Sequence, residues 1–247
     1  MKYVVGGKRQ YIIPEFDHDL QRIFTYIIEQ NLTMSLPSDL VATINAARQV
    51  ATNDIEGDFV ECGVWRGGNA LAAKMVFEKY KSPRKVYLFD TFVGMVEPTE
   101  LDVSMSGHEK DPMKKFHKSQ KKSHNEWCFA SLEDVMTNFE KAKVDISECI
   151  FVEGDVRHTL LNTEKLPEKI SILRLDTDWY ESTKVEINTL YPRLVTGGVL
   201  LLDDYALWEG HRKAVDDYFA GLATGFRPLL QISGEKGRIA IKVKEYK

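Results

Sequence analysis

Short, unbroken apolar runs alternate with amphipathic segments through most of the 247-residue chain. The apolar runs lie at 58–62, 85–89, 149–152, 170–175 and 198–202. Continuous apolar runs of this length are typical of strands that are covered on both faces. The segments at 67–80, 131–142, 181–191 and 209–222 have the apolar spacing of helices. This alternation predicts right-handed crossovers and a doubly wound, mostly parallel α/β sheet of the Rossmann-like type.

The two ends of the chain depart from this alternation. Residues 1–55 contain helical stretches at 17–31 and 37–52, so we expect an N-terminal helical cap and a core at 56–247. Near the C-terminus, FRPLLQIS and RIAIKVK flank the turn-rich sequence GEKG and predict an antiparallel hairpin at the end of the sheet. A lid-like insertion at about 94–125 is rich in Lys and His and long for a connection. It is either a solvated charged surface or a lid over a substrate.

Composition and charge narrow the class of protein. Hydrophobic residues make up 43% of the chain and charged residues 28%, which suits a folded core rather than disorder. A net charge of −4 argues against binding to the nucleic-acid backbone, and no apolar run approaches the roughly 18 residues that span a membrane. The first residues lack the apolar region of a signal peptide. Cys62, Cys128 and Cys149 are far apart, as expected for free thiols. We therefore expect a cytoplasmic protein with neither a nucleic acid nor a membrane as its partner.

Glycines and an acid follow the first two predicted core strands, where ligands bind in open parallel sheets. The sequence ECGVWRGG at 61–68 allows a tight turn and close approach of a ligand, although packing alone also explains such glycines. Asp90 follows Gly68 by 22 residues, a spacing typical of an acid that binds a ribose hydroxyl. The glycine spacing differs from the dinucleotide pattern G-x-G-x-x-G. The charge of Glu61 would also repel a pyrophosphate but attract the ammonium and sulfonium of S-adenosylmethionine, which we therefore favour.

Three aspartates follow the next two strands: Asp176 after 170–175, and Asp203 with Asp204 after 198–202. Neighbouring strands lie about 4.8 Å apart, so these carboxylates should crowd together. If no Lys or Arg lies beside them, as we expect, they repel one another unless protons or a cation intervene. Oxygen ligands alone favour magnesium, and the alternative is a solvated acidic rim without a metal. Because successive strand residues face opposite sides, Asp203 and Asp204 can act together only if the backbone bends there.

A metal ion at these aspartates would assist the transfer of a methyl group to a hydroxyl. An aspartate with a pKa of about 3.9 is mismatched by roughly 12 units, or about 16 kcal/mol, with an alcohol whose pKa resembles the 15.7 of water. A divalent cation bound to the acceptor oxygen reduces this gap. The sequence therefore predicts a magnesium-dependent O-methyltransferase with Asp176 as a catalytic residue.

Taken together, these motifs resemble those of the macrocin O-methyltransferase family. The resemblance covers most of 31–218 and rests on GDFVECGVWRGG at 57–68, LDTDWYEST at 175–183, DDY at 203–205, WEG at 208–210 and RKAVD at 212–216. It implies a class I methyltransferase fold, S-adenosylmethionine and Mg²⁺ as cofactors, and a homo-oligomer. The implied acceptor is a small hydroxylated molecule, such as a sugar or a glycosylated metabolite.

The resemblance also implies roles for single residues. It places these residues around the donor: Thr33, Ser35, Glu61, Gly63, Asp90, Thr91, Ser131 and Asp155. Within this set Asp90 would hold the ribose, and Asp155 would accept the adenine amino group unless it only caps a helix. Asp176, Asp203 and Asp204 would bind magnesium. Asp178 would lie behind the magnesium ligands without binding the ion itself, or it would cap the next helix.

Acceptor choice is less well determined, because the 94–125 segment does not resemble the antibiotic-modifying members closely. We expect His108, His117 and His124 in this segment to be solvated, and His211 to lie on a helix surface. Trp179 and Trp208 either stack against a sugar face or the sulfonium of the donor, or pack in the core of the protein.

Three other classes of function remain open at this point. Asp176-Thr177-Asp178 is also the Asp-x-Asp pattern of a nucleotide-sugar glycosyltransferase, which leaves the glycine turn and Asp90 unexplained. A dehydrogenase would require different glycine spacing. A non-catalytic S-adenosylmethionine-binding module would not need the three acids.

Overall fold

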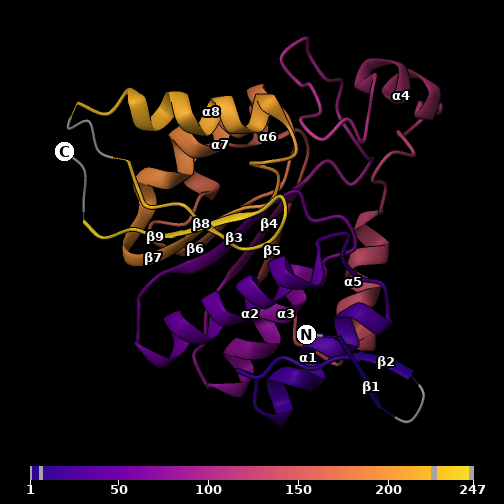
Figure 1. Ribbon diagram of the computed structural model, residues 1–247. Coiled ribbons are helices and arrows are strands. Elements are labelled where there is room, and N and C mark those ends of the chain that lie inside the picture. The colour runs from indigo at the N-terminus through magenta and orange to yellow at the C-terminus, as the bar shows by residue number, and fades with distance from the viewer. Residues whose placement is uncertain (1, 6–7, 224–226, 245–247) are drawn as a thin grey trace.

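A seven-stranded sheet runs through the centre of the computed structural model, which describes residues 2–5, 8–223 and 227–244. Its strand order is β5-β4-β3-β6-β7-β9-β8 (Figure 1). The parallel strands are β3 (Asp58–Cys62), β4 (Val86–Asp90), β5 (Cys149–Glu153), β6 (Ile170–Leu175) and β7 (Leu194–Leu202). The antiparallel strands β8 (Gln231–Ile232) and β9 (Arg238–Ile241) extend the edge beside β7. The predicted doubly wound sheet with a C-terminal hairpin is confirmed; Phe226, where the predicted hairpin begins, lies outside the described residues.

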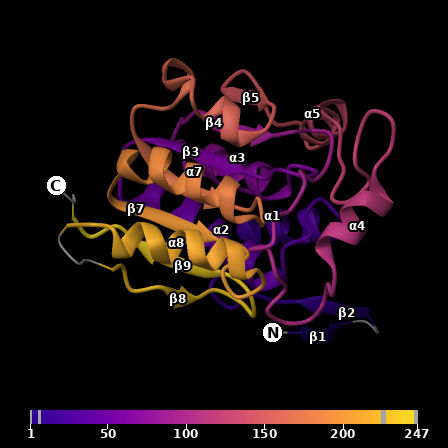
Figure 2. The ribbon, with the colours of Figure 1, turned by 90° about the horizontal axis from the view of Figure 1, so that it is seen from above.

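Helices cover both faces of this sheet (Figures 1 and 2). One face carries α1 (His18–Glu29), α2 (Pro37–Thr52), α3 (Gly68–Lys79) and α5 (Leu132–Lys141). The other carries α6 (Val156–Thr159), α7 (Tyr180–Leu190) and α8 (Glu209–Ala220). Adjacent residues of one strand enter different cores: Phe59 packs with the first group and Val60 with the second. Burial on both faces explains why the strands read as unbroken apolar runs.

The N-terminal helices share the core of the sheet rather than forming a separate one. Leu40 and Ile44 of α2 are fully buried in the same apolar cluster as Leu71 of α3 and Ile172 of β6. The helices predicted at 17–31 and 37–52 are present, whereas the division of the chain at residue 55 stays a prediction. A two-stranded antiparallel ribbon of β1 (Lys2–Val5) and β2 (Lys8–Tyr11) was not predicted.

The irregular stretch at 94–125 contains one helix, α4 (Pro112–Ser119), which the sequence analysis missed. Asp111 caps its N-terminus by accepting the backbone N–H of Lys114 at 2.9 Å, and Pro112 occupies its first turn. Figure 1 shows α4 projecting beside the sheet. Single 3₁₀ turns occur at Thr163–Lys165 and Tyr191–Arg193. Over the described residues, no helix combines the length and apolar character needed to cross a bilayer.

Candidate active site

A cavity of about 580 Å³ opens beyond the carboxyl ends of the parallel strands, where a doubly wound sheet binds its ligands. Its wall combines the turn after β3, the residues that follow β4, and the loops after β6 and β7. The 94–125 segment contributes His108, Lys115 and Ser119 to the same wall. This segment therefore faces the cavity as well as the solvent.

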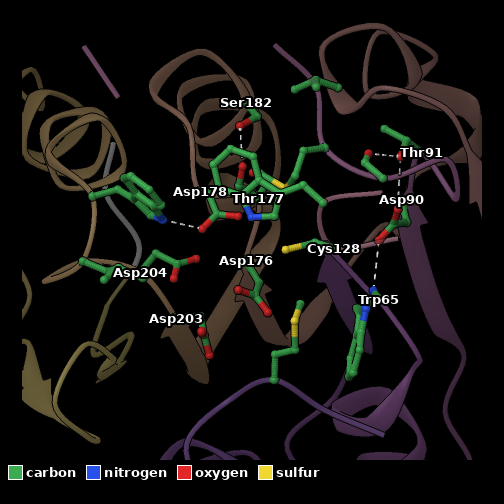
Figure 3. Close-up of a pocket in the computed structure, with 18 of the residues that line it drawn as sticks. Trp65, Asp90, Thr91, Cys128, Asp176, Thr177, Asp178, Ser182, Asp203 and Asp204 are labelled. Carbon is green, nitrogen blue, oxygen red and sulfur yellow. Dashed lines mark hydrogen bonds between the residues drawn. The ribbon is translucent and has the colours of Figure 1, made fainter. Parts of the chain in front are cut away.

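The glycine turn after β3 is fastened to the end of β4. Gly63 has a φ of +85°, and a Cβ at this position would overlap the backbone carbonyl of Asp176. Asp90 Oδ2 accepts the backbone N–H groups of Val64 at 2.6 Å and Trp65 at 3.1 Å, and Figure 3 shows the second of these bonds. Its Oδ1 accepts the N–H of Phe92 at 2.8 Å. Burial raises the pKa of Asp90, although these three amides act in the opposite direction.

Asp176, Asp203 and Asp204 meet on the other side of the cavity (Figure 3). One carboxylate oxygen of each lies within 4.8 Å of the others. The backbone bends directly after β7, so Asp203 and Asp204 both reach the cluster although they are consecutive. The sequence spacing therefore brings these acids together as expected.

The expectation that no Lys or Arg lies beside these acids is wrong. Arg174 is on β6 two residues before Asp176, so both side chains are on the same face of the strand. It contacts Asp203 and donates to Asp176 Oδ2 at 2.5 Å. Lys236, from the turn between β8 and β9, contacts Asp203 and lies 3.1 Å from Asp204 Oδ1. Burial alone would raise the pKa of Asp203, but Arg174 and Lys236 outweigh it and hold that pKa below its usual value.

Glu61 lies beneath the cavity rather than in its wall. Its side chain is 1% exposed and accepts a hydrogen bond from Arg174 at 2.9 Å. Burial raises its pKa to about 7, although Arg174 opposes the shift. The charge of Glu61 is thus met by a buried guanidinium, which weakens the expected attraction to a bound sulfonium. A donor-binding role for Glu61 stays a prediction.

The other residues predicted to bind the donor divide into two groups. Four of them line the cavity wall: Ser35, Gly63, Thr91 and Asp155. Thr33 and Ser131 lie outside it. Ser131 forms a reciprocal N-terminal cap of α5 with Asp134. Asp155 caps α6 and pairs with Arg157; burial opposes but does not overcome the effect of that pair, which lowers the pKa of Asp155.

Aromatic side chains and unusual backbone conformations surround the acids. Trp208 and Trp127 line the cavity, whereas Trp179 is buried behind them, with its ring centroid 4.9 Å from that of Trp208. Trp208 Nε1 donates to Asp178 Oδ1 at 2.6 Å, so Asp178 does not cap α7 through its side chain. Asp178 has a φ of +66° and Cys128, also in the wall, a φ of +53°. Left-handed backbone at non-glycine residues is costly and concentrates at functional sites.

The histidines depart from expectation in one case. His211 is fully buried in α8, where its Nδ1 lies 3.1 Å from Thr183 Oγ1, so the predicted surface position is wrong. Burial lowers its pKa to about 4. His108 is exposed at the rim of the cavity with its ring 5.6 Å from that of Trp208. His117 is also exposed, and His124 stacks on Phe129.

Comparison with known proteins identifies the relationship that this geometry suggests. The sequence model of the family described as Macrocin-O-methyltransferase (TylF) matches residues 24–230. The chain belongs to this family. The fold is accordingly the class I methyltransferase fold, and its match to the O-methyltransferase NovP has a TM-score of 0.74 with 27% sequence identity, covering 86% of this chain and 83% of NovP.

Two relatives that are named as O-methyltransferases are similar to part of this chain. The 8-demethyl-8-(2,3-dimethoxy-alpha-L-rhamnosyl)-tetracenomycin-C 4'-O-methyltransferase of Streptomyces olivaceus is 34% identical over 170 residues, which cover 68% of this chain and 60% of that enzyme. The demethyldecarbamoylnovobiocin O-methyltransferase of Streptomyces niveus is 31% identical over 172 residues, which cover 69% of this chain and 61% of that enzyme. The matched stretches thus span about three fifths of each relative.

Proposed function

We propose that this protein is an S-adenosylmethionine-dependent, magnesium-dependent O-methyltransferase that acts on a hydroxyl of a sugar or glycosylated metabolite. The observation that carries the proposal is that the glycine turn after β3 and the acidic triad, which consists of Asp176, Asp203 and Asp204, open into one cavity. The first is suited to hold a methyl donor and the second to hold a hydroxyl that receives the methyl group. Membership of the family and the activities named for its relatives support the same reaction.

The donor would lie along the turn after β3. Gly63 lets the ligand approach the backbone, and Asp90 faces the ribose position expected from the sequence. Asp90 already accepts three backbone N–H groups, and the hydroxyl of Thr91 adds only a long contact of 3.4 Å. A ribose hydroxyl would replace that weakest contact. Asp155, two residues after β5, lines the cavity and would accept the adenine amino group beside its pair with Arg157.

The acidic triad fits a hard divalent cation. Its ligands are carboxylate oxygens, and Asp204 Oδ2 is buried with no hydrogen-bond partner in the part of the chain that the structure describes. Asp176, Asp203 and Asp204 would hold the ion, which when bound lowers the pKa of an acceptor hydroxyl. Arg174 contacts Asp176 and Asp203 and so holds these two side chains in place.

Asp178 is placed to receive the proton of the acceptor. Its carboxylate lines the cavity beside the triad, with one oxygen fixed by Trp208. S-adenosylmethionine held along the glycine turn would supply the methyl group, and its sulfur would keep the electron pair of the broken bond. Asp178 would take the proton that the acceptor hydroxyl loses as it becomes a methyl ether. The protein contributes mainly position and charge.

The acceptor would pack on the aromatic side of the cavity. The rings of Trp127 and Trp208 offer apolar surfaces that suit the C–H faces of a sugar, and Lys115 lies 4.2 Å above the Trp127 ring. The name of the Streptomyces olivaceus relative includes a rhamnosyl group, which supports a sugar as the acceptor class. We also expect a cytoplasmic homo-oligomer, as the sequence suggested.

Ligand-dependent unfolding separates this function from the other classes. We expect S-adenosylmethionine to raise the melting temperature, and Mg²⁺ to enhance that rise, because both would bind the folded state. A rise with UDP-sugar alone would instead support a glycosyltransferase, and one with NAD alone a dehydrogenase.

Transfer of isotope-labelled methyl to a panel of glycosylated metabolites then tests the reaction itself. Loss of transfer in excess chelator, with recovery on adding Mg²⁺, supports the metal role. Donor binding without transfer to any hydroxylated acceptor would indicate a binding module.

A further inference from the structure

The turn between β8 and β9 places the side chain of Lys236 beside the acidic triad. Its backbone is fixed from two sides: the carbonyl of Lys236 accepts the N–H of Ala206 at 2.9 Å, and Ser233 Oγ donates to Asp39 Oδ1 at 2.9 Å. The first of these bonds ties the turn to the loop that follows Asp204. The second ties it to α2. The lysine side chain therefore starts from a fixed point next to the triad.

The ammonium of Lys236 occupies the side of the triad opposite to Arg174. It contacts Asp203 Oδ2 and donates to Asp204 Oδ1 at 3.1 Å, and its side chain is only 21% exposed. Arg174 meets Asp176 and the other oxygen of Asp203. Asp204 Oδ2 is left buried and unpartnered within the described residues. Two cations thus bracket the acids and leave one oxygen unsatisfied.

Lys236 and a bound divalent cation would compete for the same carboxylates. The ammonium contacts Asp203 Oδ2 and Asp204 Oδ1. A cation held by Asp203 and Asp204 with the ammonium still in place would put two positive centres against the same two side chains. Like charges at such short distances repel strongly in a buried site, so replacement is favoured.

We propose that Lys236 is an internal counter-ion that pairs with Asp203 and Asp204 in the metal-free protein and is displaced when a divalent cation binds. This inference rests on the proposed metal role of the triad. The long, flexible lysine side chain can swing away while the backbone bonds of the turn remain.

Direct binding of Mn²⁺ to the metal-free protein, followed by calorimetry, tests the exchange. We expect Lys236→Met to bind Mn²⁺ about tenfold or more tightly than the wild type, because the competing charge is gone. Lys169→Met is the matched control: Lys169 pairs with Glu56 at 2.8 Å on the surface and is 49% exposed. Its affinity should equal that of the wild type. An unchanged or weakened affinity in Lys236→Met overturns the proposal.

Lysine acetylation followed by mass spectrometry tests the same exchange in the wild-type protein and does not depend on the folding of a variant. We expect saturating Mn²⁺ to increase the acetylation of Lys236 several-fold while that of Lys169 is unchanged. Saturation without any increase overturns the exchange but leaves the metal site standing. Absence of Mn²⁺ binding in the wild type and both variants overturns the exchange and the proposed metal site together.

Discussion

Replacing Arg174 with methionine removes a buried guanidinium that links Glu61 on β3 to the acidic triad. Arg174 is 2% exposed and contacts Glu61, Asp176 and Asp203. Methionine occupies similar space but leaves these carboxylates without that partner. Removing one member of a buried ion pair costs about 3–5 kcal/mol. In a chain of this size each kcal/mol lowers the melting temperature by about 2–4 °C, so we expect a fall of about 6–20 °C near neutral pH.

The dependence of this loss on pH follows from the pKa of Asp203, which Arg174 and Lys236 hold below its usual value against the effect of burial. A carboxyl group with a lowered folded-state pKa stabilises the fold above its unfolded pKa of about 4, and this contribution disappears as pH falls through the folded-state value. The variant lacks much of this contribution. The difference between wild type and variant should therefore be larger at pH 8 than at pH 3.

Thermal unfolding followed by circular dichroism at these two pH values measures both effects. Arg157→Met provides a control, because Arg157 also pairs with an aspartate, Asp155, but is 36% exposed. Its effect should stay within about 1 kcal/mol. A fall of under 2 °C for Arg174→Met, or an equal fall at both pH values, would refute the view that Arg174 holds these acids together.

Three further changes test other parts of the site. Glu186→Gln should stabilise the protein by up to about 3 kcal/mol at pH 7 and have no effect near pH 4. Burial raises the pKa of Glu186 to about 8, so in the wild type folding becomes less favourable as pH rises above the unfolded pKa. Urea unfolding at both pH values measures the stability that the substitution adds, and an equal increase at both would contradict this reasoning. Gly63→Ala should abolish donor binding in calorimetry, since the added methyl would force Asp176 away; unchanged affinity would show that the turn tolerates it. Asp204→Ala should eliminate methyl transfer while donor affinity remains within about threefold of wild type, and retained turnover would remove Asp204 from the mechanism.

The sheet and its major helices could be predicted because local sequence determines them strongly. Strands buried on both faces, such as β6, must be apolar throughout, and their alternation with helices leaves few topologies. The order of the strands then brings Asp176 next to Asp203 and Asp204. α4 was missed because it has only eight residues and buries none of them, although Asp111 followed by Pro112 is a helix start signal.

The cations around the acids were missed for different reasons. Arg174 carries a signal, since a charged residue inside the buried run ISILRL needs a partner on the same strand face. Lys236 carries none, because its contact with Asp204 depends on how the last hairpin folds back onto the sheet. His211 did carry a signal, because it precedes Ala214 and Val215 by three and four residues and therefore lies on the buried stripe of α8, where it meets Thr183.

The bonds of Asp90 have a consequence for the kinetics of donor binding. Its carboxylate accepts the N–H groups of Val64, Trp65 and Phe92, so hydrogen bonds within the protein itself fix the shape of this wall of the cavity. A donor that meets a preorganised surface loses little affinity to ordering the protein. Association should then show a single phase whose rate rises linearly with donor concentration, with no slow isomerisation after the encounter.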